Sequence, residues 1–186
     1  KDFFSNLRPQ EMNWGRFALL MGIMLAGAIY RFAEIGYPVS YDEAYTYLAF
    51  IRGSLLQTAL DYHLPNNHIF LSLILNLVFH AFGGELWVLR LPTLLFGILM
   101  IPATYVLGKR LYNAETGLLA ALLVAIFPEL IHFSAIFRGY VLVALFTLLA
   151  FIVGDDLRRE KNRFGWLLLV VVFVLGLYTI PTMLFP

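Results

Sequence analysis

Long apolar runs separated by short polar segments constrain this chain more than any other feature. A helix needs about 20 apolar residues to cross a bilayer, and four runs approach or reach that length. They cover residues 17–35, 86–107, 117–133 and 166–184. A fifth run, residues 140–153, becomes long enough when Arg138 and Asp155 lie at the two interfaces. Hydrophobic residues make up 61% of the 186 residues and charged residues 13%. Soluble domains have about 45–50% and about 25%, so the sequence predicts an all-α integral membrane protein.

Charge and cysteine content exclude several classes of function. The net charge is +1, and the lysines and arginines stand mostly singly between apolar runs. Nucleic-acid binding needs clustered cations, so we expect membrane lipid and no nucleic acid as a partner. The chain has no cysteine, which removes disulfides and thiolate ligands from consideration.

A sixth apolar run, residues 68–82, decides the topology of everything after it. It is short and carries Asn76 and His80. If it lies in the interface, nine of the 13 lysines and arginines fall on the cytoplasmic side, whereas eight of 13 fall outside if it crosses. The positive-inside rule favours the first arrangement. This predicts about five transmembrane helices, a cytoplasmic amino terminus, and an external loop over residues 36–85 with two interfacial helices at 41–51 and 68–82.

The chain shows no internal repeat, low-complexity segment or linker, so we expect residues 1–186 to form a single transmembrane module. Residues 1–10 lack the apolar core of a signal peptide. The first apolar run is therefore expected to remain as an anchor. The sequence stops within apolar residues at 184–186, which favours the amino-terminal part of a longer polytopic protein.

Two adjacent carboxylates, Asp42 and Glu43, follow the first predicted helix. Carboxylates at a membrane surface are costly to desolvate, so a purely structural protein has little reason to place them there. That argument makes both residues candidates for catalysis. Ser40 and Glu43 also have the spacing of a capping box, and an acidic residue near a helix start favours the helix dipole. Helix capping therefore remains an alternative.

The most polar stretch of the external loop runs from Asp61 to His68. His63 and His68, with Asn66 and Asn67 between them, could bind a phosphate or a divalent cation, since imidazole is a common ligand. Histidines also serve as amphipathic interface residues. The i, i+4 histidine pair typical of helical zinc sites is absent, so a divalent metal is possible but not specified.

Three arginines lie near the outer ends of the predicted helices. Arg138 either extends toward the lipid headgroups or binds a phosphate through the N–H donors of its planar guanidinium. Arg31 and Glu34 have the i, i+3 spacing of a helical ion pair. Arg90 stands two residues before Pro92, and we expect it to anchor its helix at the interface.

The order of these features resembles the GT-C fold glycosyltransferases, especially the protein O-mannosyltransferase and aminoarabinose transferase group of glycosyltransferase family 39 and its bacterial relatives. The similarity runs over most of the chain. The segments that carry it are Tyr41-Asp42-Glu43-Ala44-Tyr45, Leu64-Pro65-Asn66-Asn67-His68, Leu89-Arg90-Leu91-Pro92, Gly108-Lys109-Arg110-Leu111-Tyr112, residues 117–123, and Arg138-Gly139-Tyr140.

The resemblance implies a catalytic base at Asp42 and places Glu43 at the second acidic position of the mannosyltransferase pair. Several relatives carry a carboxylate in the second external loop. Here the comparable stretch, Phe137-Arg138-Gly139-Tyr140, has none. This departure argues against a metal-dependent mechanism of the oligosaccharyltransferase kind.

The implied reaction transfers a sugar from a polyprenyl phosphate to an acceptor hydroxyl at the external or periplasmic face of the plasma or inner membrane. A base must take the acceptor proton, and the leaving phosphate needs electrostatic stabilisation. Direct displacement with one base inverts the anomeric configuration. The residues that we expect at the phosphate are Arg138, Tyr140, His63 and His68.

Two rival functions stay open at this level. A carrier would also have apolar helices and a polar loop, but carriers place ionisable residues near the bilayer midplane. A non-catalytic subunit that serves as a scaffold beside other membrane subunits would keep the same fold. Transfer activity of the full-length protein would distinguish the three.

Overall fold

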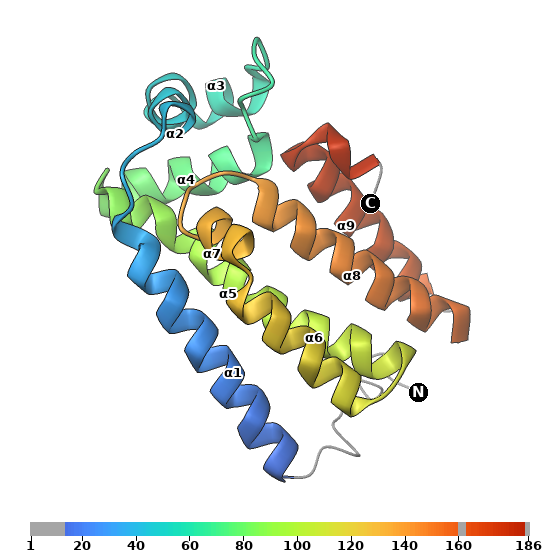
Figure 1. Ribbon diagram of the computed structural model, residues 1–186. Helices are drawn as coiled ribbons and strands as arrows, with labels where there is room; N and C mark the ends of the chain where they lie inside the picture. Colours follow the sequence, from blue (N-terminus) through green and yellow to red (C-terminus); the bar gives the residue numbers. More distant parts are fainter. Residues whose placement is uncertain (1–13, 160–162, 185–186) are drawn as a thin grey trace.

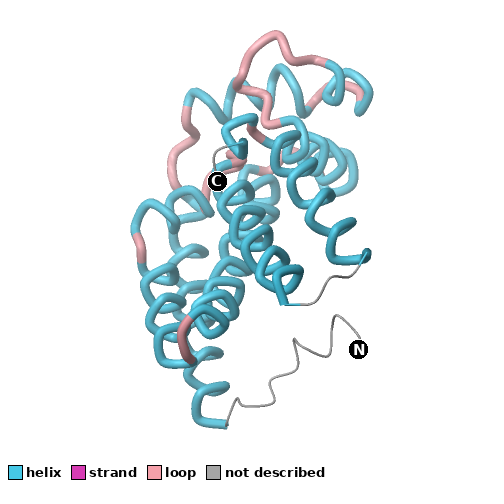
Figure 2. Tube along the Cα trace, turned by 90° about the vertical axis from the view of Figure 1, so that its right-hand side faces the viewer, coloured by secondary structure: helices cyan, strands magenta, loops and turns pink. Residues whose placement is uncertain are grey.

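The computed structural model describes residues 14–159 and 163–184. Within these ranges every regular element is a helix, which confirms the predicted all-α class. The long helices α1, α5, α6, α8 and α9 lie side by side, and the short helices α2 and α3 lie together at one end (Figure 1; Figure 2). The elements are α1 (Trp14–Ala33), η2 (Glu34–Gly36), α2 (Tyr41–Thr46), the π-helical turn η3 (Tyr47–Ile51), α3 (Leu55–Leu60), α4 (Ile69–Phe82), α5 (Leu86–Leu111), α6 (Ala114–Ile126), α7 (Pro128–Ser134), α8 (Tyr140–Arg159), α9 (Arg163–Thr179) and η4 (Pro181–Leu184).

Three of the described helices, α1, α5 and α8, are long and apolar enough to cross a membrane. The pair α6 and α7 makes a fourth span if the two are taken together, with a bend of 62° between them. The fifth predicted span corresponds to α9, which is apolar but has only 17 residues in the described range. By length and composition, the predicted five spans become three to four.

Helix α5 lies at the centre of the bundle and packs against α1, α4, α6, α7 and α8. One buried cluster joins α1, α5 and α6 through Ile23, Ile101 and Ala121. A larger one joins α4, α8 and α9 through Leu75, Leu142 and Val172. These contacts fix the long helices relative to one another.

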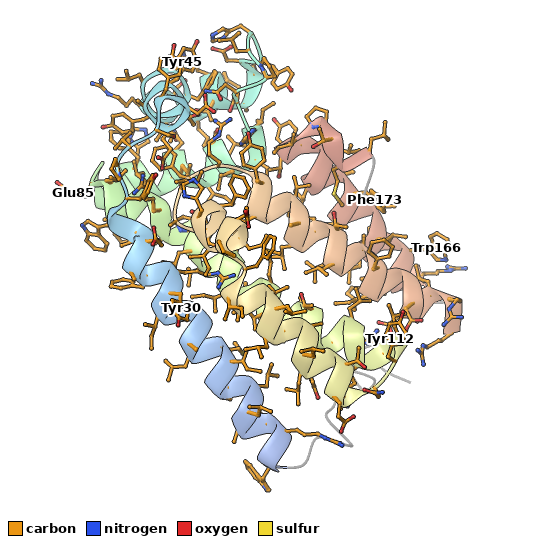
Figure 3. The ribbon with its side chains drawn as sticks, in the orientation of Figure 1. Tyr30, Tyr45, Glu85, Tyr112, Trp166 and Phe173 are labelled. Atoms are coloured by element: carbon orange, nitrogen blue, oxygen red, sulfur yellow. The ribbon has the colours of Figure 1, made fainter. Side chains whose placement is uncertain are left out.

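Aromatic residues mark the two ends of the bundle. Tyr112 and Trp166 lie at the end opposite Tyr45 (Figure 3), and both are largely exposed. Tyrosine and tryptophan concentrate at membrane–water interfaces, so this placement agrees with helices that run from one interface to the other.

Residues 36–85, predicted to form an external loop, are built differently from the two predicted interfacial helices. Residues 41–51 divide into α2 and η3, and the additional helix α3 follows. The predicted helix at 68–82 is present as one apolar helix, α4, which begins one residue later at Ile69. Its buried Asn76 donates to the carbonyls of Ile51 and Gly53, at 2.8 Å each, and so fastens the end of η3 to α4.

Candidate active site

Helix α2 begins at a capping box, as the spacing of Ser40 and Glu43 predicted. The Ser40 hydroxyl accepts from the Glu43 N–H, and the Glu43 carboxylate accepts from the Ser40 N–H. The two adjacent carboxylates consequently point in different directions. Glu43 is fully buried, whereas the Asp42 side chain is 55% exposed.

Glu43 forms an ion pair with Arg90 of α5, and both side chains are fully buried. Arg90 donates to both carboxylate oxygens, at 3.0 and 2.7 Å, and to the Tyr37 carbonyl at 2.6 Å. The prediction that Arg90 anchors its helix at the interface was therefore wrong. Its guanidinium points inward because the Glu43 carboxylate and the backbone carbonyls before α2 supply its acceptors.

Glu43 also holds the loop that follows α7. Its Oε1 accepts from the backbone N–H of Phe137 at 3.1 Å, one residue before Arg138. The carboxylate therefore connects α2, α5 and this loop, and no solvent reaches it. This arrangement makes Glu43 a positioning group for its neighbours.

Arg138 is buried, with 4% of its surface exposed, so extension toward lipid headgroups does not describe it. Its Nη1 donates to the Thr46 hydroxyl at 3.0 Å and to the Asn66 carbonyl at 3.1 Å. Its Nη2 lies 3.7 Å from Oδ2 of Asp42. Its Nε is buried without a hydrogen-bond partner among the described residues. The guanidinium is thus fixed on one side and retains donor capacity on the other.

His68 lies beside this guanidinium and is buried. Burial, together with the charge of Arg138, lowers the pKa of His68 to about 3, so the ring is neutral. Its Nδ1 accepts from the Gly139 N–H at 2.7 Å, which assigns the ring proton to Nε2. Nε2 lies 3.4 Å from Nη2 of Arg138. Both nitrogens then carry hydrogens, so they do not bond to each other and can share an acceptor such as an anionic oxygen.

A cavity of about 510 Å³ lies at this point. The residues that line it include Asp42, Arg138, His68 and Tyr140. Tyr140 also lies against the guanidinium, with 5.7 Å from Cζ of Arg138 to the ring centroid. The other lining residues are Tyr41, Tyr45, Leu64, Pro65, Asn66, Ile180 and Thr182. A volume of several hundred Å³ is typical of small-molecule sites.

His63, predicted at the phosphate, is not among the residues that line this cavity. Its Nε2 contacts the hydroxyl of Tyr45 at 3.0 Å, and its Nδ1 contacts the Asp61 carboxylate. The hydrogen bonds from His63 hold the pKa of Asp61 below its usual value. His63 therefore contacts Tyr45, which lines the cavity, but does not line the cavity itself. Asn67, from the same polar stretch, is buried and donates to the carbonyls of Thr58 and Asp61.

Sequence reasoning missed Thr46 and Asn66 as partners of Arg138. Thr46 stands four residues after Asp42, a spacing that places both on one helix face, so this signal was present in the sequence. The expected pair of Arg31 and Glu34 was wrong, because Arg31 is fully buried and donates to Ser134 and to backbone carbonyls of α1 and α6. No group of three or more histidine, aspartate or glutamate side chains that could hold a metal ion occurs among the described residues.

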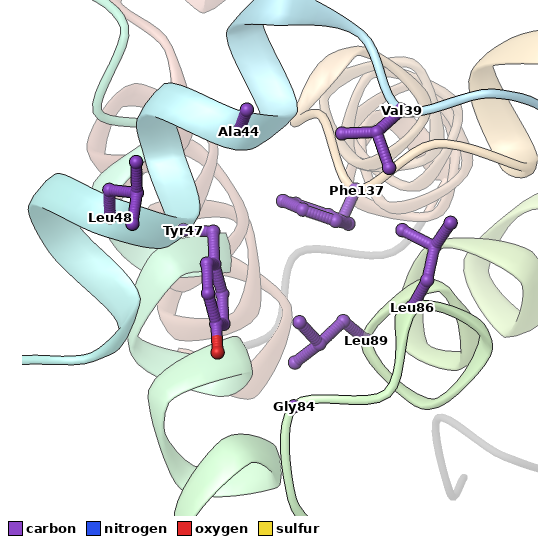
Figure 4. A pocket seen from close by; sticks show the side chains of 8 residues that line it. All are labelled: Val39, Ala44, Tyr47, Leu48, Gly84, Leu86, Leu89 and Phe137. Atoms are coloured by element: carbon purple, nitrogen blue, oxygen red, sulfur yellow. The ribbon is translucent and has the colours of Figure 1, made fainter.

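A second, apolar cavity of about 300 Å³ lies on the other side of α2 (Figure 4). Ala44, Tyr47 and Leu48 line it from α2 and η3, while Leu89 and Phe137 line it from the bundle. The buried Glu43 belongs to neither set of lining residues. Helix α2 thus presents Asp42 to a polar cavity and Ala44 to an apolar one.

Comparison with known proteins places the chain in a family. The sequence profile of the dolichyl-phosphate-mannose-protein mannosyltransferase family matches residues 65–185, more than half of the chain. The match includes His68, Arg138 and Tyr140, whereas Asp42 precedes it. No curated protein and no solved structure matches the chain. The profile match shows that the chain belongs to the dolichyl-phosphate-mannose-protein mannosyltransferase family.

Proposed function

We propose that this chain carries the catalytic module of an inverting glycosyltransferase, which moves a sugar from a polyprenyl-phosphate donor to an acceptor hydroxyl at the outer face of a cell membrane. Family membership supports a glycosyltransferase of the mannosyltransferase kind. The observation that carries the finer proposal is the Asp42 carboxylate beside the buried Arg138 guanidinium on the wall of one cavity.

In the proposed reaction, Asp42 takes the proton of the acceptor hydroxyl. The acceptor oxygen attacks the anomeric carbon from the face opposite the phosphate, and the bond between that carbon and the phosphate oxygen breaks. The bonding electrons leave with the phosphate. Because the leaving group needs no proton, fixed positive charge and hydrogen-bond donors suffice to stabilise it.

The donor phosphate would lie against Arg138 and His68, which line the same cavity and bring Nη2 and Nε2 within 3.4 Å of each other. Tyr140 would pack beside it. Glu43 contributes by holding Arg90 and the loop before Arg138, and His63 contributes by orienting Tyr45. Residues 1–186 act as one transmembrane module in this proposal, with the amino terminus in the cytoplasm. The nine-to-four split of lysines and arginines supports that orientation.

The test is turnover of a labelled mannosyl phosphoryl polyprenol by the purified full-length protein in lipid nanodiscs. We expect the sugar to appear on a hydroxyl acceptor with inverted anomeric configuration, determined by NMR of the product. Retention of configuration would contradict direct displacement. A folded protein that binds no donor and transfers no sugar would instead support the scaffold function.

A further inference from the structure

Arg31 of α1 is a fully buried arginine that lies outside the cavity. Its Nη2 donates to the Val124 carbonyl at 2.9 Å, and its Nη1 donates to the Ala125 carbonyl at 3.0 Å. Its Nε donates to the Ser134 hydroxyl at 3.2 Å, and Nη1 also reaches the Gly27 carbonyl at 3.1 Å. One guanidinium therefore connects α1 to the last turn of α6 and to the end of α7.

The sequence of α6 and α7 explains why these acceptors are available. In a continuous helix, the Val124 carbonyl would accept from the backbone N–H of residue 128. Residue 128 is a proline, which has no N–H and breaks a helix at this point. The chain bends by 62° between Ile126 and Pro128. Within a bilayer, a carbonyl freed in this way needs a donor from the protein, and Arg31 supplies it.

Two glycines make room for the guanidinium. A Cβ atom on Gly27 would lie 3.3 Å from Nη1 of Arg31 and 2.6 Å from a methyl group of Ile101. A Cβ atom on Gly97 of α5 would lie 3.1 Å from Nε of Arg31 and would overlap the Ser134 side chain. The arginine thus occupies a site that α1, α5 and α7 build around it.

We infer that Arg31 is a positioning residue for the cavity, because it replaces the hydrogen-bond donor that Pro128 lacks and fixes the direction in which α7 leads to Arg138. Helix α7 ends at Ser134, which Arg31 holds directly. Only four residues later the chain places the Arg138 guanidinium on the cavity wall. The structural part of this inference stands alone, and its effect on donor use rests on the proposed function.

The experiment compares Arg31→Met, Pro128→Ala and the double variant in the full-length protein. Met has similar length and no donor, while Ala at position 128 restores a backbone N–H. Spin labels at Glu129→Cys on α7 and Phe151→Cys on α8, both exposed positions, report the placement of α7, in a background without other cysteines. Donor KM and kcat are measured in parallel. Arg52→Met, at an exposed arginine of the external segment, is the matched control.

We expect Arg31→Met to shift or broaden the distance distribution between the labels and to raise donor KM more than it lowers kcat. A displaced Arg138 would make weaker charge-assisted hydrogen bonds to the donor phosphate, so a rise in donor KM of about tenfold to hundredfold is expected. Pro128→Ala should recover part of both effects when it is combined with Arg31→Met. Arg52→Met should change neither.

Label distances and donor KM that match the unsubstituted protein in Arg31→Met would overturn the inference, as would a shifted distance with unchanged donor KM. If Arg31→Met does not fold, Arg31→Gln, which keeps one amide donor, takes its place under the same criteria. If the unsubstituted protein itself transfers no sugar, the proposed function fails. The label distances then test only whether Arg31 fixes the direction of α7. A shift in Arg31→Met that Pro128→Ala reverses would support this role, and an unchanged distance would contradict it.

Discussion

Oε2 of Glu43 lies 2.7 Å from Nη2 of Arg90, and neither side chain is exposed to solvent. The pair connects α2 to α5 over 47 positions of sequence. The same carboxylate accepts from the Phe137 N–H. Since the ions satisfy each other, removal of either one leaves an uncompensated charge in the protein interior.

Glu43→Gln is expected to lower the stability of the full-length protein in detergent. Loss of one partner of a buried ion pair costs about 3–5 kcal/mol, so the apparent melting temperature should fall by several degrees. Glu85→Gln is the control, because Glu85 is exposed and its side chain makes no cap hydrogen bond. An unchanged melting temperature for Glu43→Gln would show that the pair does not support the fold.

Asp42→Asn is expected to reduce sugar transfer by about two to four orders of magnitude, the usual contribution of a general base. The amide keeps the size of the side chain but cannot take a proton. Stability should be unchanged, because Asp42 is half-exposed and its contact with Arg138 is 3.7 Å long. Turnover and melting temperature are measured together, with Glu34→Gln as the exposed control. Full activity of Asp42→Asn would remove Asp42 from the mechanism.

Arg138→Lys tests whether the planar donor fork matters beyond its charge. Lysine keeps the positive charge but has three donors on one nitrogen in place of the five in the planar fork, so it presents fewer donors to the cavity once it bonds Thr46 and Asn66. We expect donor KM to rise by about tenfold or more, with a smaller change in stability. Arg52→Lys serves as the control at an exposed position. Equal losses of stability and donor use would assign Arg138 to folding alone.

His68 gives the protein a predictable sensitivity to acid. Its folded-state pKa is about 3, below the value of about 6.5 for an unfolded histidine. Above pH 6.5 both states are neutral and the contribution of His68 to stability is complete. Between pH 6.5 and 3 only the unfolded state binds the proton, so stability falls by up to about 1.4 kcal/mol per pH unit.

The measurement is the melting temperature of the full-length protein from pH 7.5 to pH 5. In His68→Asn, whose side-chain oxygen can still accept from Gly139, the decline below pH 6.5 should be shallower. His80→Asn, at an exposed histidine, should keep the original slope. Identical slopes in all three proteins would mean that His68 is not the buried neutral group described above.

Single cysteines at Tyr62 and Tyr112 test the proposed orientation. Both side chains are exposed, and they lie on opposite sides of the membrane if the amino terminus is cytoplasmic. An impermeant thiol reagent should label Tyr62→Cys in intact cells and Tyr112→Cys only after permeabilisation. The reverse pattern would invert the orientation.

Local patterns predicted the parts of this fold that depend on neighbours in sequence. Apolar length predicted α1, α5 and α8, and the spacing of Ser40 and Glu43 predicted the start of α2. The helix α3 was missed because its six residues are too few to show a clear period. The site residues Asp42, His68 and Arg138 could be predicted only because they are polar residues beside apolar helices and because the chain resembles a known family.

Contacts between distant segments could not be read in the same way. Periodicity gives no indication that Arg90 turns toward Glu43, or that Arg31 turns toward α6 across more than 90 positions. Both arginines stand near helix ends, where exposure to headgroups is the ordinary expectation. Arg31 bonds to carbonyls that are free because the helix breaks at Pro128, and Arg90 bonds to backbone carbonyls before α2. These acceptors come near the arginines only in the folded protein.

The burial of Arg138 has a consequence for the surroundings in which the protein works. Mobile ions screen exposed charges within about 8–10 Å at physiological ionic strength but act much less on buried ones. Only 5% of the Arg138 side chain is exposed, so its attraction for a phosphate is formed largely by fixed protein groups. Recognition of an anionic ligand there would stay nearly constant while the ionic strength of the surrounding solution varies.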